Sequence, residues 1–440
     1  MDKDFDELSD DQTGVRGDGL PNWDNRELTN DYTDEGNRHP GVDVPFLVLT
    51  LLLLTIGVIM VLSASFAREY YTSGEPTRLF MRQLVFAISG VAIMLVVSRV
   101  NVRTLSRWSM HLLFVSIGLL VLVLVAGVKV NGARRWLSIG GSNSLLRFQP
   151  SEIAKLSLIL VFAQMICRFG KARMRTFKYG VVPFITVTAI LVGLIALETH
   201  LSASIIITSL AVILMFAGGT RLRWFALAGL VIAALAGALV FLYIRTPAQN
   251  GDTQNVKEML VQTSWDDAGL GYAGKRINAW LDPESDPLGD GFQIRQSLYA
   301  IGSGGLLGQG LGQSKQKYLY LPEEHNDYIF AIVCEELGFI GAMLILMLFA
   351  LLIIRGFWLA LHAKDKFSSL VVTGITSLLA IQVFLNVAVV TNILPATGIS
   401  LPFFSSGGTA LWIQLVQVGI VLSVSREIPT DFEDEELVES

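Results

Sequence analysis

The sequence predicts an all-α polytopic membrane protein with about ten transmembrane helices and a large extracytoplasmic loop between helices 7 and 8. Its 440 residues are 52% hydrophobic and 16% charged, whereas an average soluble domain carries about 25% charged residues. The apolar residues gather in long runs, and Lys and Arg concentrate in alternate connections between those runs. Lipid is therefore the expected main solvent of this chain.

Ten apolar runs are each long enough to cross the hydrocarbon core, which takes about 20 mainly apolar residues in a helix. Backbone groups find no partners in lipid, so each run is expected to be a helix that satisfies its own hydrogen bonds. The predicted spans are residues 45–65, 79–98, 109–128, 151–168, 180–198, 201–219, 224–244, 327–354, 368–392 and 407–424.

The spans form a membrane domain, residues 45–425, between two acidic tails, residues 1–44 and 426–440. The first tail combines Asp and Glu with Gly, Asn and Thr and cannot bury enough apolar surface to fold alone, so it is predicted to be disordered. The net charge of −5 comes from these ends and gives no reason to expect nucleic acid as a partner.

The positive-inside rule orients the spans, because Lys and Arg of short loops stay in the cytoplasm. Basic residues follow spans two, four, six, eight and ten, which predicts a multi-pass membrane protein with both termini cytoplasmic. One outer connection breaks the rule, and anion binding would explain it. Its basic residues are Lys129, Arg134, Arg135 and Arg147.

The loop at residues 246–326 is far longer than the usual helix connection of about 2 to 8 residues, which favours a functional segment. Its centre carries Arg276 and two aspartates that precede prolines, Asp282 and Asp286. Its glycine-rich part, residues 302–312, follows no predicted strand and lacks the Lys-Ser/Thr ending of a phosphate loop, so close packing or use as a hinge is expected there.

Four sequence blocks resemble those of the SEDS family (FtsW/RodA/SpoVE), in the order of that family and on the expected side of the membrane. They are Gly132-Ala133-Arg134-Arg135-Trp136 with Gln149-Pro150-Ser151-Glu152 and Lys155, Asp286-Pro287-Leu288-Gly289 with Gly291-Phe292-Gln293 and Gln296-Ser297-Leu298-Tyr299, Leu321-Pro322-Glu323-Glu324-His325-Asn326-Asp327 with Glu335-Glu336, and Pro395-Ala396-Thr397-Gly398-Ile399-Ser400-Leu401-Pro402 with Ser405-Ser406-Gly407-Gly408.

Two departures stand out within this resemblance. Glu198-Thr199-His200 replaces the Gln-Pro-Asp that is common in the family, and Ser406 replaces an aromatic residue. The first change puts in doubt any role carried over to that corner of the protein.

The resemblance implies that the protein polymerises lipid II into peptidoglycan, with the growing chain as donor and undecaprenyl pyrophosphate as leaving group. A positioned carboxylate can contribute about 10² to 10⁴ as general base. Asp286 matches the family's catalytic aspartate and is the predicted base. Asp282, which also precedes a proline, is the rival from the sequence pattern alone.

The leaving pyrophosphate needs cations, and Arg suits oxyanions because of its planar fork. Glu152 and Lys155 are three residues apart on one helix face, where they can bind substrate or form a structural ion pair. Arg134 and Arg135 can bind phosphate or anchor to lipid headgroups. The predicted substrate and pyrophosphate ligands are Arg134, Arg135, Lys155, Glu152, Arg276, Gln296, Ser297, His325, Thr397 and Ser405, with Arg295 as a further cation.

The acidic run before the eighth span resembles a metal site in composition, because carboxylates and imidazole suit divalent cations. Its spacing matches no specific signature, so a divalent cation such as Mg or Mn is left open as a cofactor. Two carboxylates deeper in that span, Glu335 and Glu336, are expected in a structural polar network. The residues of the acidic run are Glu323, Glu324, His325 and Asp327.

Septal wall synthesis during division is the favoured role, and a RodA-like elongation polymerase is the runner-up. A lipid II flippase and a scaffold for a transpeptidase are the other classes; the absence of an obvious inverted repeat weighs against a transporter. The resemblance implies a class B penicillin-binding protein and other divisome proteins as partners, together with the membrane.

Overall fold

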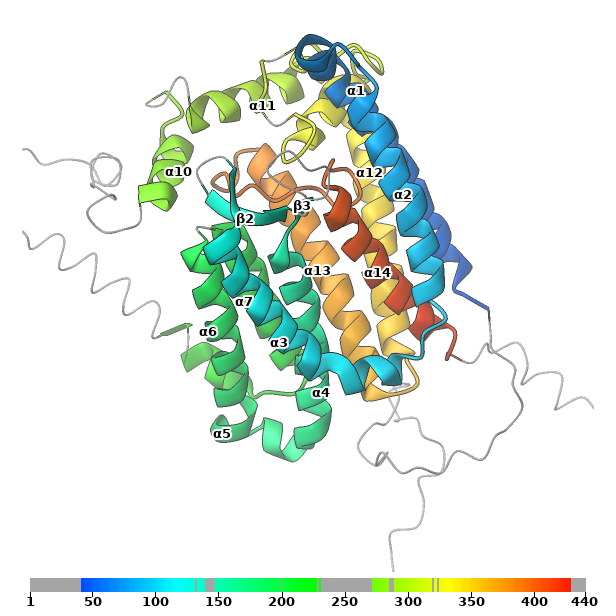
Figure 1. The fold of residues 1–440 in the computed structure, drawn as a ribbon, viewed down its shortest axis with the longest axis vertical. Helices are drawn as coiled ribbons and strands as arrows, with labels where there is room; N and C mark the ends of the chain where they lie inside the picture. Colours follow the sequence, from blue (N-terminus) through cyan, green and yellow to red (C-terminus); the bar gives the residue numbers. More distant parts are fainter. Residues whose placement is uncertain are drawn as a thin grey trace, which may run out of the picture.

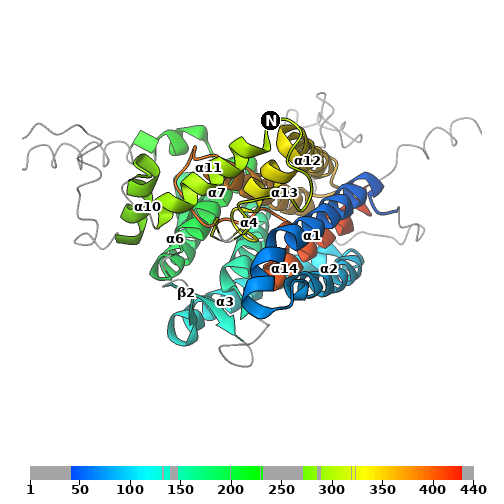
Figure 2. The ribbon, with the colours of Figure 1, turned by 90° about the horizontal axis from the view of Figure 1, so that it is seen from above.

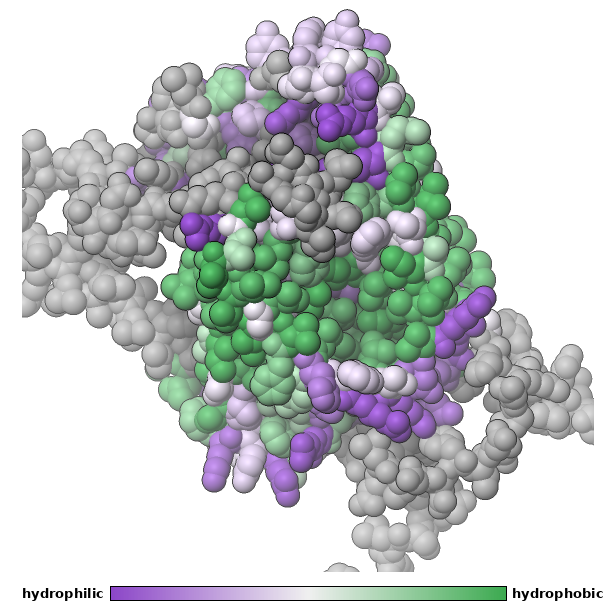
Figure 3. Space-filling model, viewed as in Figure 1, coloured by the Kyte–Doolittle hydropathy of each residue, from purple (hydrophilic) through white to green (hydrophobic). Residues whose placement is uncertain are grey.

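The computed structural model describes residues 41–130, 133–138, 147–198, 200–227, 229–230, 271–284, 289–318, 320–322 and 324–428. These residues form a helical bundle with a small sheet and two further helices at one end (Figure 1). On the face that Figure 3 shows, an apolar belt covers the bundle between two more polar ends. The protein is therefore a multi-pass membrane protein of the predicted fold class.

Eight helical spans in the described part of the chain are long and apolar enough to cross a membrane. A ninth helix, α7 (Leu201–Ala217), is apolar but shorter. The eight are α1 (Val44–Ser73), α2 (Arg78–Val97), α3 (Val102–Ala126), α4 (Pro150–Met174), α5 (Phe177–Gly180) together with α6 (Val182–Leu197), α12 (Ile329–Leu361), α13 (Lys366–Val390) and α14 (Gly408–Ser425).

These helices correspond to every predicted span except the seventh. Only residues 224–227 and 229–230 of that run are described, so the count of ten stays a prediction. The predicted disorder of the first tail mostly concerns residues 1–40, which lie outside the described ranges, as do residues 429–440 of the second tail. At the end of the first tail the prediction is wrong, because Asp43 caps α1 and Val44 begins this helix.

The centre of the bundle contains α4, α13 and α14, whose side chains are mostly buried. Close backbone contacts hold the surrounding helices against this centre. At Gly57 of α1, a Cβ atom would lie 2.4 Å from the carbonyl oxygen of Phe403, so only glycine permits this approach. The ends of α1 and α12 that the positive-inside rule predicts to be cytoplasmic are tied by Asp43, which caps α1 and pairs with Arg355 of α12 at 2.5 Å.

A three-stranded antiparallel sheet lies at the end of the bundle that carries the basic outer connection. This sheet was not predicted from the sequence. Its order is β1-β2-β3, and β2 pairs with both neighbours. Two helices, α10 (Gly271–Leu281) and α11 (Asp290–Gly304), lie at this same end (Figures 1 and 2). The strands are β1 (Val128–Val130), β2 (Ala133–Ser138) and β3 (Arg147–Phe148).

Helix α12 is broken at Gly338, where φ is 68° and ψ is −172°. The two N–H groups after the break lose their helical acceptors, and the two carbonyls before it lose their donors. The segment 305–310 replaces all four partners, which confirms the close packing expected of this glycine-rich stretch. The bonds run from Phe339 N to Gly305 O (2.9 Å), Ile340 N to Leu306 O (3.1 Å), Gln309 N to Glu335 O (2.9 Å) and Gly310 N to Glu336 O (3.0 Å).

The connection between α13 and α14, residues 391–407, is not helical, as its prolines predict. Asn386 of α13 holds it in place: its side-chain nitrogen donates to the carbonyls of Asp327 at 2.8 Å and Ile399 at 2.7 Å. This connection therefore has a fixed shape at the outer end of the bundle, where it meets the start of α12.

Candidate functional site

The ion pair predicted at the start of α4 is present. Lys155 Nζ donates to Glu152 Oε1 at 2.7 Å, and the Lys155 side chain is almost fully buried. Pro150 begins the helix, because its fixed φ suits the first turn, and this sets both side chains on one face. A buried lysine that keeps a carboxylate partner is held in one position at the outer end of the membrane domain.

His200, in the connection between α6 and α7, is close enough to three cations to be affected by their charge. Burial and, in decreasing order, the positive charges of Arg135, Lys155 and Arg276 together lower the pKa of His200 to about 3. The imidazole is therefore neutral near pH 7. Its ring nitrogens lie 3.4 and 3.5 Å from Gln149 Nε2. We call Arg135, Lys155, Arg276 and His200 the outer cation cluster.

Glu198, two residues before His200, supplies a buried carboxyl next to this cluster. Burial raises the pKa of Glu198 to about 8, and the charge of Arg135 opposes that rise. Where the SEDS pattern has Gln and Asp, this chain has Glu198 and His200, so the carboxyl has moved by two positions while staying in the same connection. The connection between α6 and α7 therefore keeps one carboxyl group, although its sequence differs from the SEDS pattern.

Arg276 joins the long outer loop to the connection between α13 and α14. Its Nη1 donates to the carbonyl of Ala396 at 2.8 Å. Gly398 lies between two charged groups, since a Cβ atom there would be 3.3 Å from Asp327 Oδ2 and 3.8 Å from Arg276 Nη1. Thr397 is buried beside them, and its carbonyl accepts a hydrogen bond from Ser202 Oγ.

A second polar group joins the segment before α12 to α1 and to the connection between α13 and α14, where Ser406 Oγ donates to Asn326 Oδ1 at 2.5 Å. Arg68 Nη1 lies 3.6 Å from Glu324 Oε2 and 3.5 Å from His325 Nδ1, while Asn326 Nδ2 is 3.2 Å from His325 Nε2. Ser405 is buried, and its carbonyl accepts from Gln83 at 2.8 Å. His325 and Ser405 thus lie in this second group rather than in the outer cation cluster.

The remaining predicted ligands are dispersed. Arg134 is exposed and donates to the Leu124 carbonyl at 3.3 Å. Ser297 is fully buried and donates to the Val390 carbonyl at 2.8 Å, which packs α11 against α13. Gln296 and Arg295 are half-buried on α11.

The predicted base Asp286 and the acidic residue Glu323 lie outside the described residues. The rival base Asp282 is half-buried, and its Oδ1 accepts from the Glu284 backbone at 3.3 Å. Within the described ranges, no three His, Cys, Asp or Glu residues are grouped so that they could hold a metal ion.

Glu335 and Glu336 form the structural network that the sequence predicted, here called the carboxylate network. Both are buried. Glu336 accepts from Ser63 Oγ at 2.6 and 2.7 Å and from Lys317 Nζ at 3.0 Å. Glu335 accepts from the Ser314 hydroxyl at 2.5 Å and the Lys315 backbone at 2.9 Å. The network fastens the segment after α11 to α1 and α12.

Sequence reasoning missed Glu198, His200 and Arg68 as members of these groups. The available signal was their position, because each is an ionisable residue at the outer end of an apolar run. Charges at that depth are candidates for function by default.

Comparisons with known proteins agree with the sequence resemblance. The sequence model of the FtsW/RodA/SpoVE family, described as cell cycle protein, matches residues 44–429. Stage V sporulation protein E of Bacillus subtilis is 41% identical over 386 residues, which cover 87% of this chain and 97% of that protein. A Trichlorobacter lovleyi protein named Probable peptidoglycan glycosyltransferase FtsW is 38% identical over 385 residues, covering 87% and 93%.

Solved structures share the fold. A structure titled "Structural coordination of polymerization and crosslinking by a peptidoglycan synthase complex" matches with a TM-score of 0.65 and 29% identity, covering 88% of this chain and 98% of the other. The rod shape determining protein RodA of Thermus thermophilus matches with a TM-score of 0.60 and 26% identity, covering 89% and 98%.

Proposed function

Because the chain belongs to the FtsW/RodA/SpoVE family of cell cycle proteins, we propose that it is a peptidoglycan glycosyltransferase that polymerises lipid II at the outer face of the cytoplasmic membrane. The single observation that carries this proposal is the outer cation cluster. Three basic side chains gather around one neutral histidine at the end of the membrane domain. A lipid-linked pyrophosphate needs such cations at the boundary between lipid and water.

The reaction joins two sugars and releases a pyrophosphate. A hydroxyl oxygen of the acceptor attacks the anomeric carbon of the donor chain, and the bond from that carbon to the undecaprenyl pyrophosphate oxygen breaks. The hydroxyl proton passes to a base, and one further negative charge develops on the pyrophosphate as it leaves. A carboxylate near the acceptor and fixed cations near the leaving group would both lower the barrier.

We assign the base to Asp286. Its segment connects α10 to α11, and Arg276 ties α10 to the α13–α14 connection through the Ala396 carbonyl. The helices on either side of this segment, α10 and α11, lie at the same end of the bundle as the cation cluster, and this supports the assignment. Asp282 already accepts a backbone hydrogen bond at the end of α10, which favours a capping role for it.

We assign the leaving group to Arg135, Lys155 and Arg276. Lys155 and Arg276 are held by Glu152 and by the Ala396 carbonyl, so neither side chain has to be ordered when substrate binds. A neutral His200 can donate one ring hydrogen bond without adding charge. Thr397, in the connection between α13 and α14 that Arg276 contacts, adds a further polar side chain to this group.

A division role with a class B penicillin-binding protein is the proposed biological setting. Division fits the family description as cell cycle protein and the 38% identity to a protein named FtsW, and the similar peptidoglycan synthase complex coordinates polymerisation and crosslinking. The alternating basic connections support cytoplasmic termini. Other divisome proteins would then reach the acidic tails.

The test is to reconstitute the protein with its penicillin-binding partner in vesicles that contain fluorescent lipid II. We expect glycan polymer on the side where the outer loop is exposed, and we would repeat the reaction with and without Mg or Mn to settle the cation. Lipid II that crosses the bilayer while no polymer forms would favour the flippase and overturn the proposal.

A further inference from the structure

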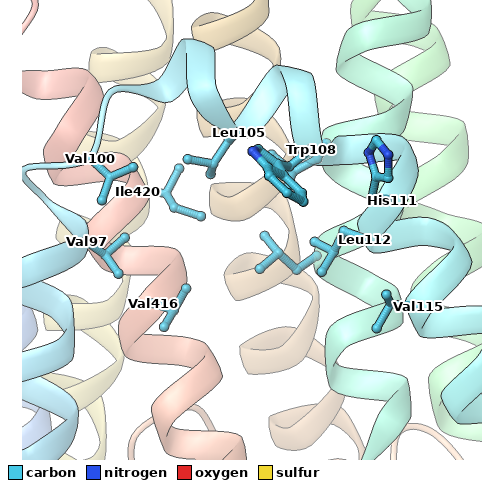
Figure 4. A pocket seen from close by; sticks show the side chains of 11 residues that line it. Val97, Val100, Leu105, Trp108, His111, Leu112, Val115, Val416 and Ile420 are labelled. Atoms are coloured by element: carbon cyan, nitrogen blue, oxygen red, sulfur yellow. The ribbon is translucent and has the colours of Figure 1, made fainter.

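An apolar groove runs between α3 and α14 near the end of the bundle opposite the sheet (Figure 4). Its volume is about 360 Å³, within the range of roughly 300 to 1,000 Å³ that is usual for ligand pockets. Two leucines of α4 also contribute to its lining. The walls include Leu105, Trp108, Leu112 and Val115 of α3 and Val416 and Ile420 of α14.

The groove is part of the fold, because each wall is fixed separately. On one side, Gln164 of α4 bonds to α3 twice: it accepts from Ser109 Oγ at 2.6 Å and donates to the Ser106 carbonyl at 2.8 Å. On the other side, Ser423 of α14 donates to the Val100 carbonyl at 2.5 Å. Different hydrogen bonds therefore hold the two walls in place, and the groove lies open between them.

A basic edge borders this apolar space. Arg99 and Arg107 are exposed, and neither has an ion-pair partner among the described residues. Arg103, Arg107 and His111 are spaced four residues apart and therefore form a column along α3. His111 lines the groove itself, so the column leads from the membrane surface to the apolar wall.

We propose that this groove binds an anionic glycerophospholipid, with one acyl chain between α3 and α14 and its phosphate beside Arg99 and Arg107. Arginines at a membrane surface attract anionic headgroups. Their long apolar stems let the charged ends stay at the interface. A transmembrane helix of another protein could cover the apolar walls of the groove, but its apolar surface would not account for the arginines beside it. With the proposed orientation, the lipid belongs to the cytoplasmic leaflet.

Trp108 provides a local probe, because it lines the groove and is 63% exposed. The full-length protein would be reconstituted in phosphatidylcholine vesicles, and brominated phosphatidylglycerol or brominated phosphatidylcholine would be added in increasing mole fraction. The difference in emission between wild type and Trp108→Phe isolates this tryptophan. Bromine quenches its emission only when a labelled chain touches it.

We expect brominated phosphatidylglycerol to half-quench Trp108 at a mole fraction about fivefold or more below that of the phosphatidylcholine probe. The double variant Arg99→Gln/Arg107→Gln should abolish this preference. The matched control Arg175→Gln/Arg221→Gln, which removes two exposed arginines at the ends of α4 and α7, should keep it. Because all four arginines are on the surface, folding is not expected to change.

Filling the groove with Leu112→Phe/Val416→Phe should weaken quenching by both probes. Equal quenching by both headgroups in wild type would overturn the proposal and leave an ordinary lipid contact. Absence of quenching by either probe would also overturn it and would indicate that a protein segment covers the groove. These readouts involve no glycan synthesis, so they stand or fall independently of the glycosyltransferase activity.

Discussion

The outer cation cluster and the carboxylate network are both buried polar groups at the outer end of the same bundle, yet their chemistry differs. In the network, Glu335 and Glu336 receive donors from Ser63, Lys317 and the segment after α11, so their oxygens are satisfied within the protein. In the cluster, three cations surround a histidine that burial keeps neutral.

This difference separates a structural role from a binding role. Desolvating a charge costs free energy that its partners must offset. In the carboxylate network, donors within the protein offset that cost. The network thereby fixes the segment after α11 that packs against α12 at Gly338. The cluster instead concentrates positive charge, which a pyrophosphate would complement. Disrupting the network should therefore change stability first, and disrupting the cluster should change activity first.

The largest effect is expected from Lys317→Met, which leaves the Glu336 carboxylate buried without its cation. Removal of one partner of a buried pair costs about 3 to 5 kcal/mol. Thermal unfolding in detergent would measure the loss. Adding Glu336→Gln should recover much of it, whereas Lys315→Met, at an exposed position, should stay within about 0.5 kcal/mol of wild type.

Gly338→Ala should destabilise the protein by about 1 to 3 kcal/mol from backbone strain alone, because φ is 68° there. The added Cβ would also lie 2.2 Å from Gly308 N, so the hydrogen bonds between α12 and residues 305–310 would break. Gly302→Ala is the matched control, since a Cβ there meets nothing within 4 Å in helix α11. If both variants unfold at the same temperature, the proposed stabilisation of the broken helix α12 by residues 305–310 is incorrect.

Arg276→Gln should lower the rate of glycan polymerisation about 10- to 100-fold, because a hydrogen bond to a charged group contributes about 1.5 to 3 kcal/mol. Arg134→Gln should change the rate less than about threefold, since Arg134 is exposed and outside the cluster. Polymer yield from lipid II and the unfolding temperature would be measured together. A larger effect at Arg134 would show that the pyrophosphate binds elsewhere.

Measured per pH unit, the smallest expected change is in the pH dependence of stability. Burial raises the pKa of Glu198 to about 8, against an ordinary value of 4.5. The unfolded chain therefore loses this proton first, and stability falls as the pH rises from 4.5 to 8, by at most about 1.4 kcal/mol per pH unit. Glu198→Gln should flatten this part of the stability profile. An unchanged slope would show that Glu198 ionises normally in the folded protein.

The sequence predicted most of the fold because transmembrane spans depend on composition over about 20 residues, and that signal is local. The ion pair of Lys155 with Glu152 was also local, since it follows from helical spacing. The exchange of hydrogen bonds between Gly338 and residues 305–310 was not predictable from periodicity, because its partners are about 30 residues apart. The short strands carry too few residues to show a pattern.

The candidate site was predicted only in part for the same reason. Family motifs indicated Arg135 and Lys155, and the long outer loop indicated Arg276, but their proximity to His200 depends on the packing of α4, α7 and α10. Ser297 lies in the same motif as Gln296, yet it packs into α13. A motif records which residues recur and leaves open whether each side chain faces substrate or the core.

The most direct measurement is glycan synthesis from lipid II by the purified protein with its penicillin-binding partner, comparing wild type, Asp286→Asn and Asp282→Asn. Asparagine keeps the size and hydrogen-bonding oxygen of either aspartate while removing the base. We predict that Asp286→Asn lowers the rate about 10²- to 10⁴-fold with unchanged unfolding temperature and that Asp282→Asn polymerises normally. Normal polymer from a folded Asp286→Asn variant would contradict the assignment of the catalytic base.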